Sequence, residues 1–114
     1  MLTEDVKSDI IRNEKGFSIA YEKIEKFCLL PGAKHSEEFF SVGYRPSDVH
    51  KLINDILSDT DSDKITDIMK FPNNVEKFSL FMYLGVTKKK RFRTVWQKDT
   101  PESYPRLITA YRED

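Results

Sequence analysis

At 114 residues the chain is long enough to enclose one hydrophobic core, and we take residues 1–114 as a single domain. Its apolar share of 39% and its eight phenylalanines exclude a disordered chain, although 33% of the residues are charged. The formal net charge of zero argues against indiscriminate binding of polyanions. Residues 86–114 nevertheless hold eight Lys and Arg against four Asp and Glu, which allows a local patch for phosphate or for an acidic partner.

The residue types that build metal and redox sites are scarce in this chain. Its one cysteine, Cys28, lies in the apolar run 27–30, which predicts a small buried side chain and excludes an internal disulfide framework. Two histidines and one cysteine do not supply the four ligands of a structural zinc site. We therefore expect neither a metal nor a cofactor.

Signals for membrane insertion and export are not visible in the sequence. No apolar run approaches the ~20 residues that cross a membrane. The first 15 residues mix both signs of charge and contain no continuous apolar core, so they do not resemble a signal peptide. We expect no membrane association and a cytoplasmic location, or else a fragment cut from a larger exported protein.

Residues 1–17 form a mixed-charge lead-in that we expect to be partly helical or flexible. Residues 20–28 then place Tyr21, Ile24, Phe27 and Cys28 at helical spacing, which predicts a helix. Pro31 and Gly32 end it, because proline disfavours helical geometry in the residue before it and glycine permits a turn. A second, short helix is expected over residues 34–43.

The strongest helical pattern follows Ser47. This residue is a favourable N-cap, and Asp48 places a negative charge in the first turn, where it meets the helix dipole. The apolar stripe of a core-facing helix then consists of Val49, Leu52, Ile53, Ile56 and Leu57. The helix is expected to end at the polar loop 58–63.

Beyond residue 63 the pattern changes to that of strands. Residues 64–71 fit either a strand or a frayed helix, while three later segments are rich in β-favouring residues: 77–86, 91–97 and 106–112. Helices that precede consecutive strands joined by short loops are typical of an α+β fold. We therefore predict two or three N-terminal helices packed on a four-stranded antiparallel β-sheet.

Alternation along these strands assigns their side chains to the two faces of the sheet. In segment 91–97, one face is predicted to carry Phe92, Thr94 and Trp96, and the other Arg91, Arg93 and Val95. In segment 106–112, a shared face is predicted for Leu107, Thr109 and Tyr111.

No strong catalytic signature is present: the sequence lacks a glycine-rich phosphate loop, metal-ligand spacing and a nucleophile elbow. His35 is the first candidate because it lies between a turn and a helix, where a side chain can project into a cleft. Imidazole titrates near neutral pH and serves as a general acid or base. A surface or capping histidine is the simpler interpretation, and for His50, one residue off the apolar stripe, we expect a solvated side chain.

A basic run over residues 88–93 is the second candidate. Its cations suit a phosphate backbone, with Phe92 or Trp96 able to stack on a base, although for the three lysines we favour a solvated turn that discourages aggregation. Arg93 differs because a strand fixes its direction, and a held arginine stabilises developing phosphate charge. Thr109 and Tyr111, the third candidate, place two hydroxyls beside this arginine, but both are also ordinary strand formers.

Four short segments between Glu22 and the C-terminus carry a resemblance to known proteins. They are Glu22-Lys23-Ile24 to Leu30-Pro31-Gly32-Ala33-Lys34-His35, then Glu38-Phe39-Phe40-Ser41-Val42-Gly43-Tyr44, Arg93-Thr94-Val95-Trp96, and Pro105-Arg106-Leu107-Ile108-Thr109-Ala110-Tyr111. In these segments the chain resembles a small bacterial domain family found in phage-associated and toxin-like proteins. Its members resemble RNases of the barnase–EndoU–colicin–RelE superfold.

The resemblance implies two helices on a four-stranded antiparallel sheet and a metal-free RNase. Such enzymes cleave RNA by attack of the ribose 2′-hydroxyl on the adjacent phosphate, which requires a base, a cation for the phosphorane and an acid for the leaving oxygen. By this resemblance His35 is the acid or base, and Arg93 is the phosphate clamp. Thr109 or Tyr111 is a positioning hydroxyl, and Lys34 adds a second positive charge.

Two functions follow as hypotheses. The first is a metal-independent endoribonuclease, a toxin module that acts on RNA and pairs with a cognate inhibitor; its substrate-binding candidates are Lys34, Arg91 and Trp96. The second is a non-catalytic binding module, such as a phage accessory protein or an immunity-type inhibitor, which docks a protein partner through its acidic helices and basic sheet edge. The sequence leaves both hypotheses open.

Overall fold

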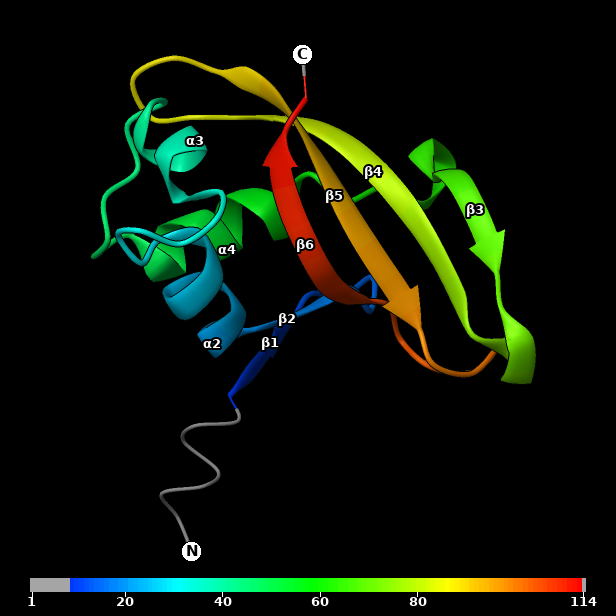
Figure 1. The fold of residues 1–114 in the computed structure, drawn as a ribbon. Helices are drawn as coiled ribbons and strands as arrows, with labels where there is room; N and C mark the ends of the chain where they lie inside the picture. Colours follow the sequence, from blue (N-terminus) through cyan, green and yellow to red (C-terminus); the bar gives the residue numbers. More distant parts are fainter. Residues whose placement is uncertain (1–8, 114) are drawn as a thin grey trace, which may run out of the picture.

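In a computed structural model, residues 9–113 are described, and residues 1–8 and 114 lie outside this range (Figure 1). Two short strands come first, β1 (Ile10–Arg12) and β2 (Ser18–Ala20). Four strands follow later in the chain: β3 (Thr66–Lys70), β4 (Glu76–Leu84), β5 (Lys90–Lys98) and β6 (Arg106–Arg112). The described strands form one six-stranded sheet in the order β1-β2-β6-β5-β4-β3.

The helices lie between β2 and β3 in the described part of the chain. α2 (Tyr21–Lys23) continues directly into η1 (Ile24–Cys28), which has the wider hydrogen bonding of a π-helix. α3 (Ser36–Phe40) and α4 (Val49–Ser58) follow, and two single turns, η2 (Ser62–Lys64) and η3 (Pro72–Asn74), flank β3. Figure 1 shows α2, α3 and α4 gathered on one side of β6, with β3 at the far edge of the sheet.

The α+β class predicted from the sequence is confirmed, but the sheet differs from the predicted four antiparallel strands. β3 to β6 do form an antiparallel meander. β1 and β2 add an antiparallel hairpin, and β2 joins β6 in the parallel sense at one residue pair, Ser18 and Arg106. The sheet is therefore mixed, and the described chain begins with strands rather than with helices.

Asn13 organises the segment that was expected to be a helical or flexible lead-in. Its Oδ1 accepts hydrogen bonds from the backbone N–H groups of Lys15 and Phe17, which closes the turn between β1 and β2. Its Nδ2 donates to the carbonyl of Leu57 and to the hydroxyl of Thr60, at the end of α4. The predicted partial helix is wrong for the described part of the lead-in, because these distant contacts favour a hairpin; the remainder of the lead-in lies outside the described residues.

The helix predicted over residues 20–28 is present, but its buried face is rotated. In the π-helical turn the Leu29 N–H donates to the carbonyl of Ile24, five residues back. This wider turn buries Ile24, Cys28 and Leu29 and leaves Phe27 60% exposed. Phe27 was expected on the apolar face because the prediction assumed ordinary α-helical spacing.

The apolar stripe of α4 is confirmed, since all five of its predicted members are buried. The helix cap differs from the prediction. Asp48, and not Ser47, occupies the position before the first helical residue, Val49. The Asp48 carboxylate accepts from the backbone N–H of Arg45 and so stabilises the preceding turn.

Trp96 is the largest side chain of the core between helices and sheet, and it is fully buried. Phe17 packs edge-on against it, with ring centroids 5.1 Å apart. Its indole N–H donates to Thr94 Oγ1 at 2.7 Å, and the Thr94 hydroxyl donates to the carbonyl of Leu80 at 2.8 Å. The polar groups that burial removes from water are thus satisfied by one another.

A β-bulge in β6 changes the predicted face of Leu107. Trp96 of β5 pairs with Leu107, but the residue before Trp96 pairs with Thr109, so Ile108 is an extra residue. Leu107 therefore points into the core and is 3% exposed, while Thr109 and Tyr111 lie on the opposite face of the sheet. The prediction of a shared face is thus right for Thr109 and Tyr111 and wrong for Leu107, because one inserted residue reverses the alternation of side chains.

Replacing Thr94 by Val is expected to lower the free energy of unfolding by about 1–3 kcal/mol, because the buried Trp96 N–H loses its acceptor. Urea denaturation followed by the fluorescence of Trp96 measures this loss. Thr94→Ser is the control: it keeps the hydroxyl and removes one methyl group, so it is expected to cost about 1 kcal/mol or less. Equal losses in both variants would show that the hydrogen bond is not the source of the stabilisation.

Candidate functional site

His35 lies immediately before α3 and is held by the first turn of that helix. Its Nδ1 is 3.0 Å from Glu38 Oε2, and the side chains are 25% and 33% exposed. The second oxygen of Glu38, Oε1, accepts from the backbone N–H of Arg112 in β6 at 2.7 Å. One carboxylate thus orients the imidazole and attaches the start of α3 to the last strand.

The ring of Tyr111 stacks on the imidazole of His35, with centroids 5.3 Å apart and an interplanar angle of 28°. Tyr111 belongs to β6, where it pairs with Arg93 of β5. Thr109, two residues earlier on β6, lines a cleft together with His35. Three of the four predicted catalytic residues, His35, Thr109 and Tyr111, are therefore brought together at the edge of β6.

The cleft beside His35 has a volume of about 210 Å³. The helical layer and the loop before α3 form one wall, and β6 forms the other. Its lining residues are Lys23, Phe27, Cys28, Lys34, His35, Ile108, Thr109 and Ala110. Two of these are lysines and none is a carboxylate, so the described surface of this "His35 cleft" attracts anions.

Cys28 lines the cleft but is only 3% exposed, which confirms the predicted burial. Loss of solvation raises the pKa of its thiol from 9.0 to about 12, although the nearby Lys23 charge acts in the opposite direction. A thiol that stays protonated near neutral pH is a poor nucleophile. Cys28 is a packing residue of the cleft wall.

Arg93 lies on the outer face of the sheet and already has anionic partners. Its Nη2 is 2.9 Å from Asp67 Oδ2, its Nη1 is 3.4 Å from Glu113 Oε2, and its Nε donates to the Ser79 hydroxyl at 3.0 Å. Asp67 reaches this position from a left-handed backbone conformation, φ +54°, at the irregularity of the β3–β4 pairing. Two carboxylates balance the guanidinium, so the geometry does not fit the predicted phosphate clamp.

The remaining substrate-binding candidates occupy three different environments. Lys34 is exposed and lines the His35 cleft. Arg91 is exposed on the outer face, where its guanidinium lies 4.0 Å from the ring centre of Phe81. Trp96 and Phe92 are both fully buried in the core, so the prediction that one of them stacks on a base is wrong.

Two residues of the site were not singled out from the sequence. Glu38 follows His35 by three positions, a spacing that places side chains side by side on a helix, so the sequence did contain a signal for this pair. Lys23 comes from α2, and only the packing of α2 beside β6 brings it to the cleft. No local pattern indicates that contact.

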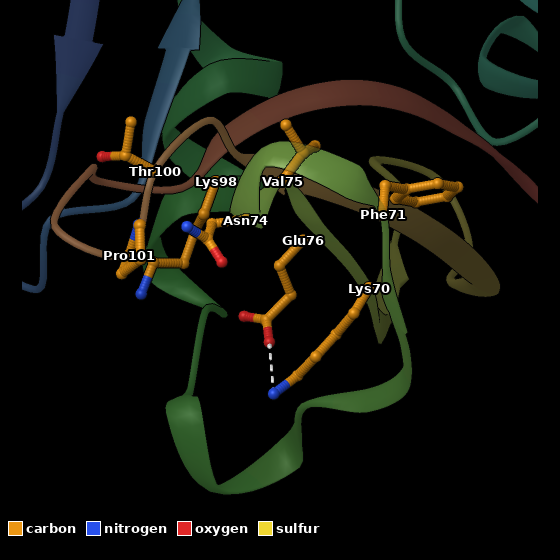
Figure 2. Close-up of a pocket in the computed structure, with 8 residues that line it drawn as sticks. All are labelled: Lys70, Phe71, Asn74, Val75, Glu76, Lys98, Thr100 and Pro101. Atoms are coloured by element: carbon orange, nitrogen blue, oxygen red, sulfur yellow. Dashed lines mark ion pairs between the residues drawn. The ribbon is translucent and has the colours of Figure 1, made fainter.

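A separate hollow of about 270 Å³ lies at the opposite end of the sheet, near the β3–β4 turn (Figure 2). Lys70, Glu76 and Lys98 line it, and the Lys70 ammonium is 3.9 Å from the Glu76 carboxylate. None of the site residues predicted from the sequence belongs to it. An exposed lysine, Lys70, a half-buried lysine, Lys98, and turn residues form most of this hollow.

Within residues 9–113, no group of three or more His, Cys, Asp and Glu side chains is arranged to hold a metal ion. Over the same range, no helix has the length and apolar character needed to cross a membrane. Comparison with known proteins gives no match: no family model fits the sequence, and no curated protein or solved structure is significantly similar to it.

The thiol of Cys28 is expected to react about a thousandfold more slowly than free cysteine at pH 8. The reason is that raising the pKa from 9.0 to about 12 lowers the fraction of reactive thiolate about a thousandfold. Labelling with a chromogenic disulfide reagent measures the rate. Cys28 is the one cysteine of the chain, so the signal belongs to it alone. Urea should restore rapid labelling; rapid labelling of the folded protein would contradict the burial.

Proposed function

We propose that the chain is a metal-independent endoribonuclease whose reacting centre is the His35 cleft. The supporting observation is the pair formed by His35 and Glu38 at the mouth of a cleft that two lysines line. A carboxylate can only accept a hydrogen bond, so Glu38 keeps the proton of the neutral imidazole on Nδ1. Nε2, for which no described residue provides a hydrogen bond, is then free to act as the general base.

In this proposal the ribose 2′-hydroxyl gives its proton to Nε2 of His35 as its oxygen attacks the adjacent phosphorus. The bond from phosphorus to the 5′-oxygen breaks, and the products are a 2′,3′-cyclic phosphate and a 5′-hydroxyl. Lys23 and Lys34 offset the negative charge of the phosphorane, and one of their ammonium groups gives a proton to the leaving 5′-oxygen. Thr109 offers a hydroxyl to a phosphate oxygen, while Tyr111 keeps the imidazole in place.

Purified protein is expected to cut RNA in the presence of EDTA and to leave 2′,3′-cyclic phosphate ends. His35→Ala should lower the rate by at least about a hundredfold, since it removes the general base. His50→Ala is the matched control, because His50 is exposed on α4 and does not line the cleft. Equal activity in the two variants, or activity that EDTA abolishes, would reject the proposal.

The lysine and arginine candidates are separated by a second pair of variants in the same assay. Lys34→Gln is expected to slow cleavage with little effect on stability, because Lys34 is an exposed cation of the cleft. Arg93→Gln is expected to lower the melting temperature, since Asp67 and Glu113 lose their shared counter-ion, while the folded variant still cuts RNA. The reverse result would return the role of phosphate clamp to Arg93.

One observation favours a second candidate, a non-catalytic module that docks a protein partner. β3 is the last strand in the sheet order, and its Ile68 and Met69 are 55% and 56% exposed, followed by Phe71 at 38%. An edge strand with exposed apolar side chains suits the addition of a strand from another protein. For this candidate, the RNA assay shows no turnover and a pull-down recovers a stoichiometric complex.

A further inference from the structure

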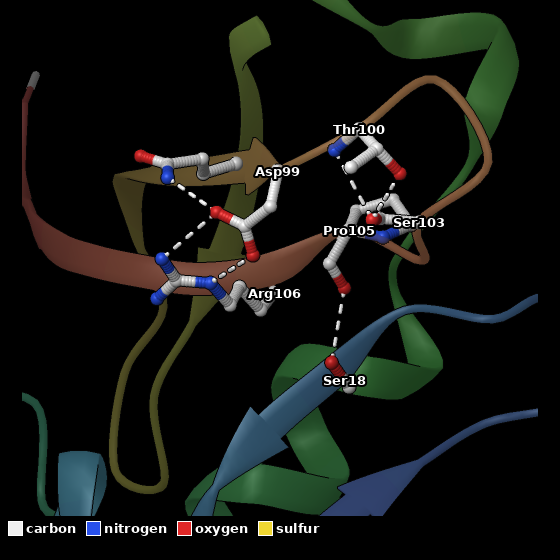
Figure 3. Close-up of polar contacts among 7 residues, drawn as sticks. Ser18, Asp99, Thr100, Ser103, Pro105 and Arg106 are labelled. Atoms are coloured by element: carbon white, nitrogen blue, oxygen red, sulfur yellow. Dashed lines mark hydrogen bonds and ion pairs between the residues drawn. The ribbon is translucent and has the colours of Figure 1, made fainter. Parts of the chain in front are cut away.

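A second cleft lies beside the His35 cleft, between β2 and β6. These strands meet at Ser18, whose backbone N–H and hydroxyl both donate to the carbonyl of Pro105, at 2.9 and 3.1 Å; Figure 3 shows the hydroxyl bond. Beyond this point the strands separate, because β2 leads directly into α2 whereas β6 continues along β5. The separation leaves a cleft of about 340 Å³, here called the β2–β6 cleft.

The β2–β6 cleft is cationic. Arg12, Lys23 and Arg106 line it, against one lining carboxylate, that of Asp99. Asp99 is already bound by Arg106 through two hydrogen bonds of 3.0 and 3.1 Å, which lower the pKa of the carboxyl group (Figure 3). Between residues 9 and 113, no carboxylate pairs with Arg12 or Lys23, so their charges are available to an anion.

Tyr104 adds an aromatic surface to the same cleft and is 59% exposed. The Arg12 guanidinium lies 4.7 Å from the centre of its ring. One edge of the ring packs closely against Gly16. A Cβ at this position would lie 2.5 Å from Tyr104 Cδ1, and the φ of +93° also favours glycine there. Tyr104 is thus a positioned ring, and bases of single-stranded nucleic acid stack on such rings and on arginine planes.

Lys23 connects the two clefts, because its side chain lines both of them. We propose that the β2–β6 cleft binds the nucleotide next to the scissile phosphate of a single-stranded RNA. The base lies against Tyr104, and the phosphate lies between Arg12 and Lys23. A base in a duplex is stacked and paired, so it cannot reach the ring; the substrate class is therefore single-stranded. This inference rests on the proposed function, which places the scissile phosphate at His35.

Binding of a fully 2′-O-methylated RNA of roughly eight nucleotides tests the inference, because this length suits a single-strand site and the probe lacks the attacking hydroxyl. Fluorescence anisotropy of a labelled probe measures the affinity. Tyr104→Ala is expected to weaken binding by about fivefold to a hundredfold, and Tyr104→Phe to retain it. Arg12→Gln is expected to weaken binding and to reduce its dependence on salt by about one phosphate contact.

Tyr83→Ala is the matched control, because Tyr83 is equally accessible, at 62%, but lies on β4 and away from the cleft. Circular dichroism melts show whether each variant is folded, and Arg12→Gln tests the site independently if Tyr104→Ala is not. Unchanged affinity in the folded variants overturns the inference, whether or not the wild type cuts RNA. Failure of the wild type to bind the probe also overturns it. Weakened binding by a protein that cuts no RNA keeps the single-strand site and rejects the proposed reaction.

Discussion

The Glu38 carboxylate joins the helical layer to the edge of β6, and the geometry of the His35 cleft depends on it. One oxygen accepts from the backbone of Arg112 and the other binds His35. Because the first bond satisfies a strand N–H that β5 does not reach, it stabilises the fold, and because the second orients an imidazole, it shapes the site. The ring of Tyr111 stacks on the imidazole of His35 from the side of the sheet. Fold stability and site geometry are thus coupled through one side chain.

The surroundings of Arg93 and the His35 cleft differ in their charge, although β5 and β6, which contribute to them, are neighbours in the sequence. On the outer face, Arg93 is surrounded by two carboxylates and a hydroxyl, so its charge contributes to the cohesion of three strands and the C-terminal segment. Along the opposite edge of β6, Lys23 and Lys34 line a cleft without a lining carboxylate in the described chain. In the described chain, Lys23 and Lys34 thus lack the carboxylate partners that Arg93 has.

Much of the fold could be predicted from local patterns. The long strands and α4 were located to within one or two residues, since alternation with period 2 and apolar spacing near 3.6 both arise from backbone geometry that each segment carries by itself. For the candidate site, the sequence singled out His35, Lys34, Thr109 and Tyr111, and the fold places these residues around one cleft; their catalytic and binding roles stay a proposal. Trp96 was assigned to substrate although it fills the core, because an aromatic side chain in a strand has the same pattern in either role.

The amino-acid sequence by itself determined the α+β class, the two faces of β5 and the burial of Cys28, because these follow from composition and from contacts within a segment. Only the tertiary structure decided the hairpin of β1 and β2, the bulge at Ile108 and the partners of Arg93. Each of these depends on contacts between residues far apart in the chain, such as Asn13 with Leu57 or Arg93 with Asp67. Such contacts do not recur at a regular spacing along the chain, so no periodic pattern in the sequence indicates them.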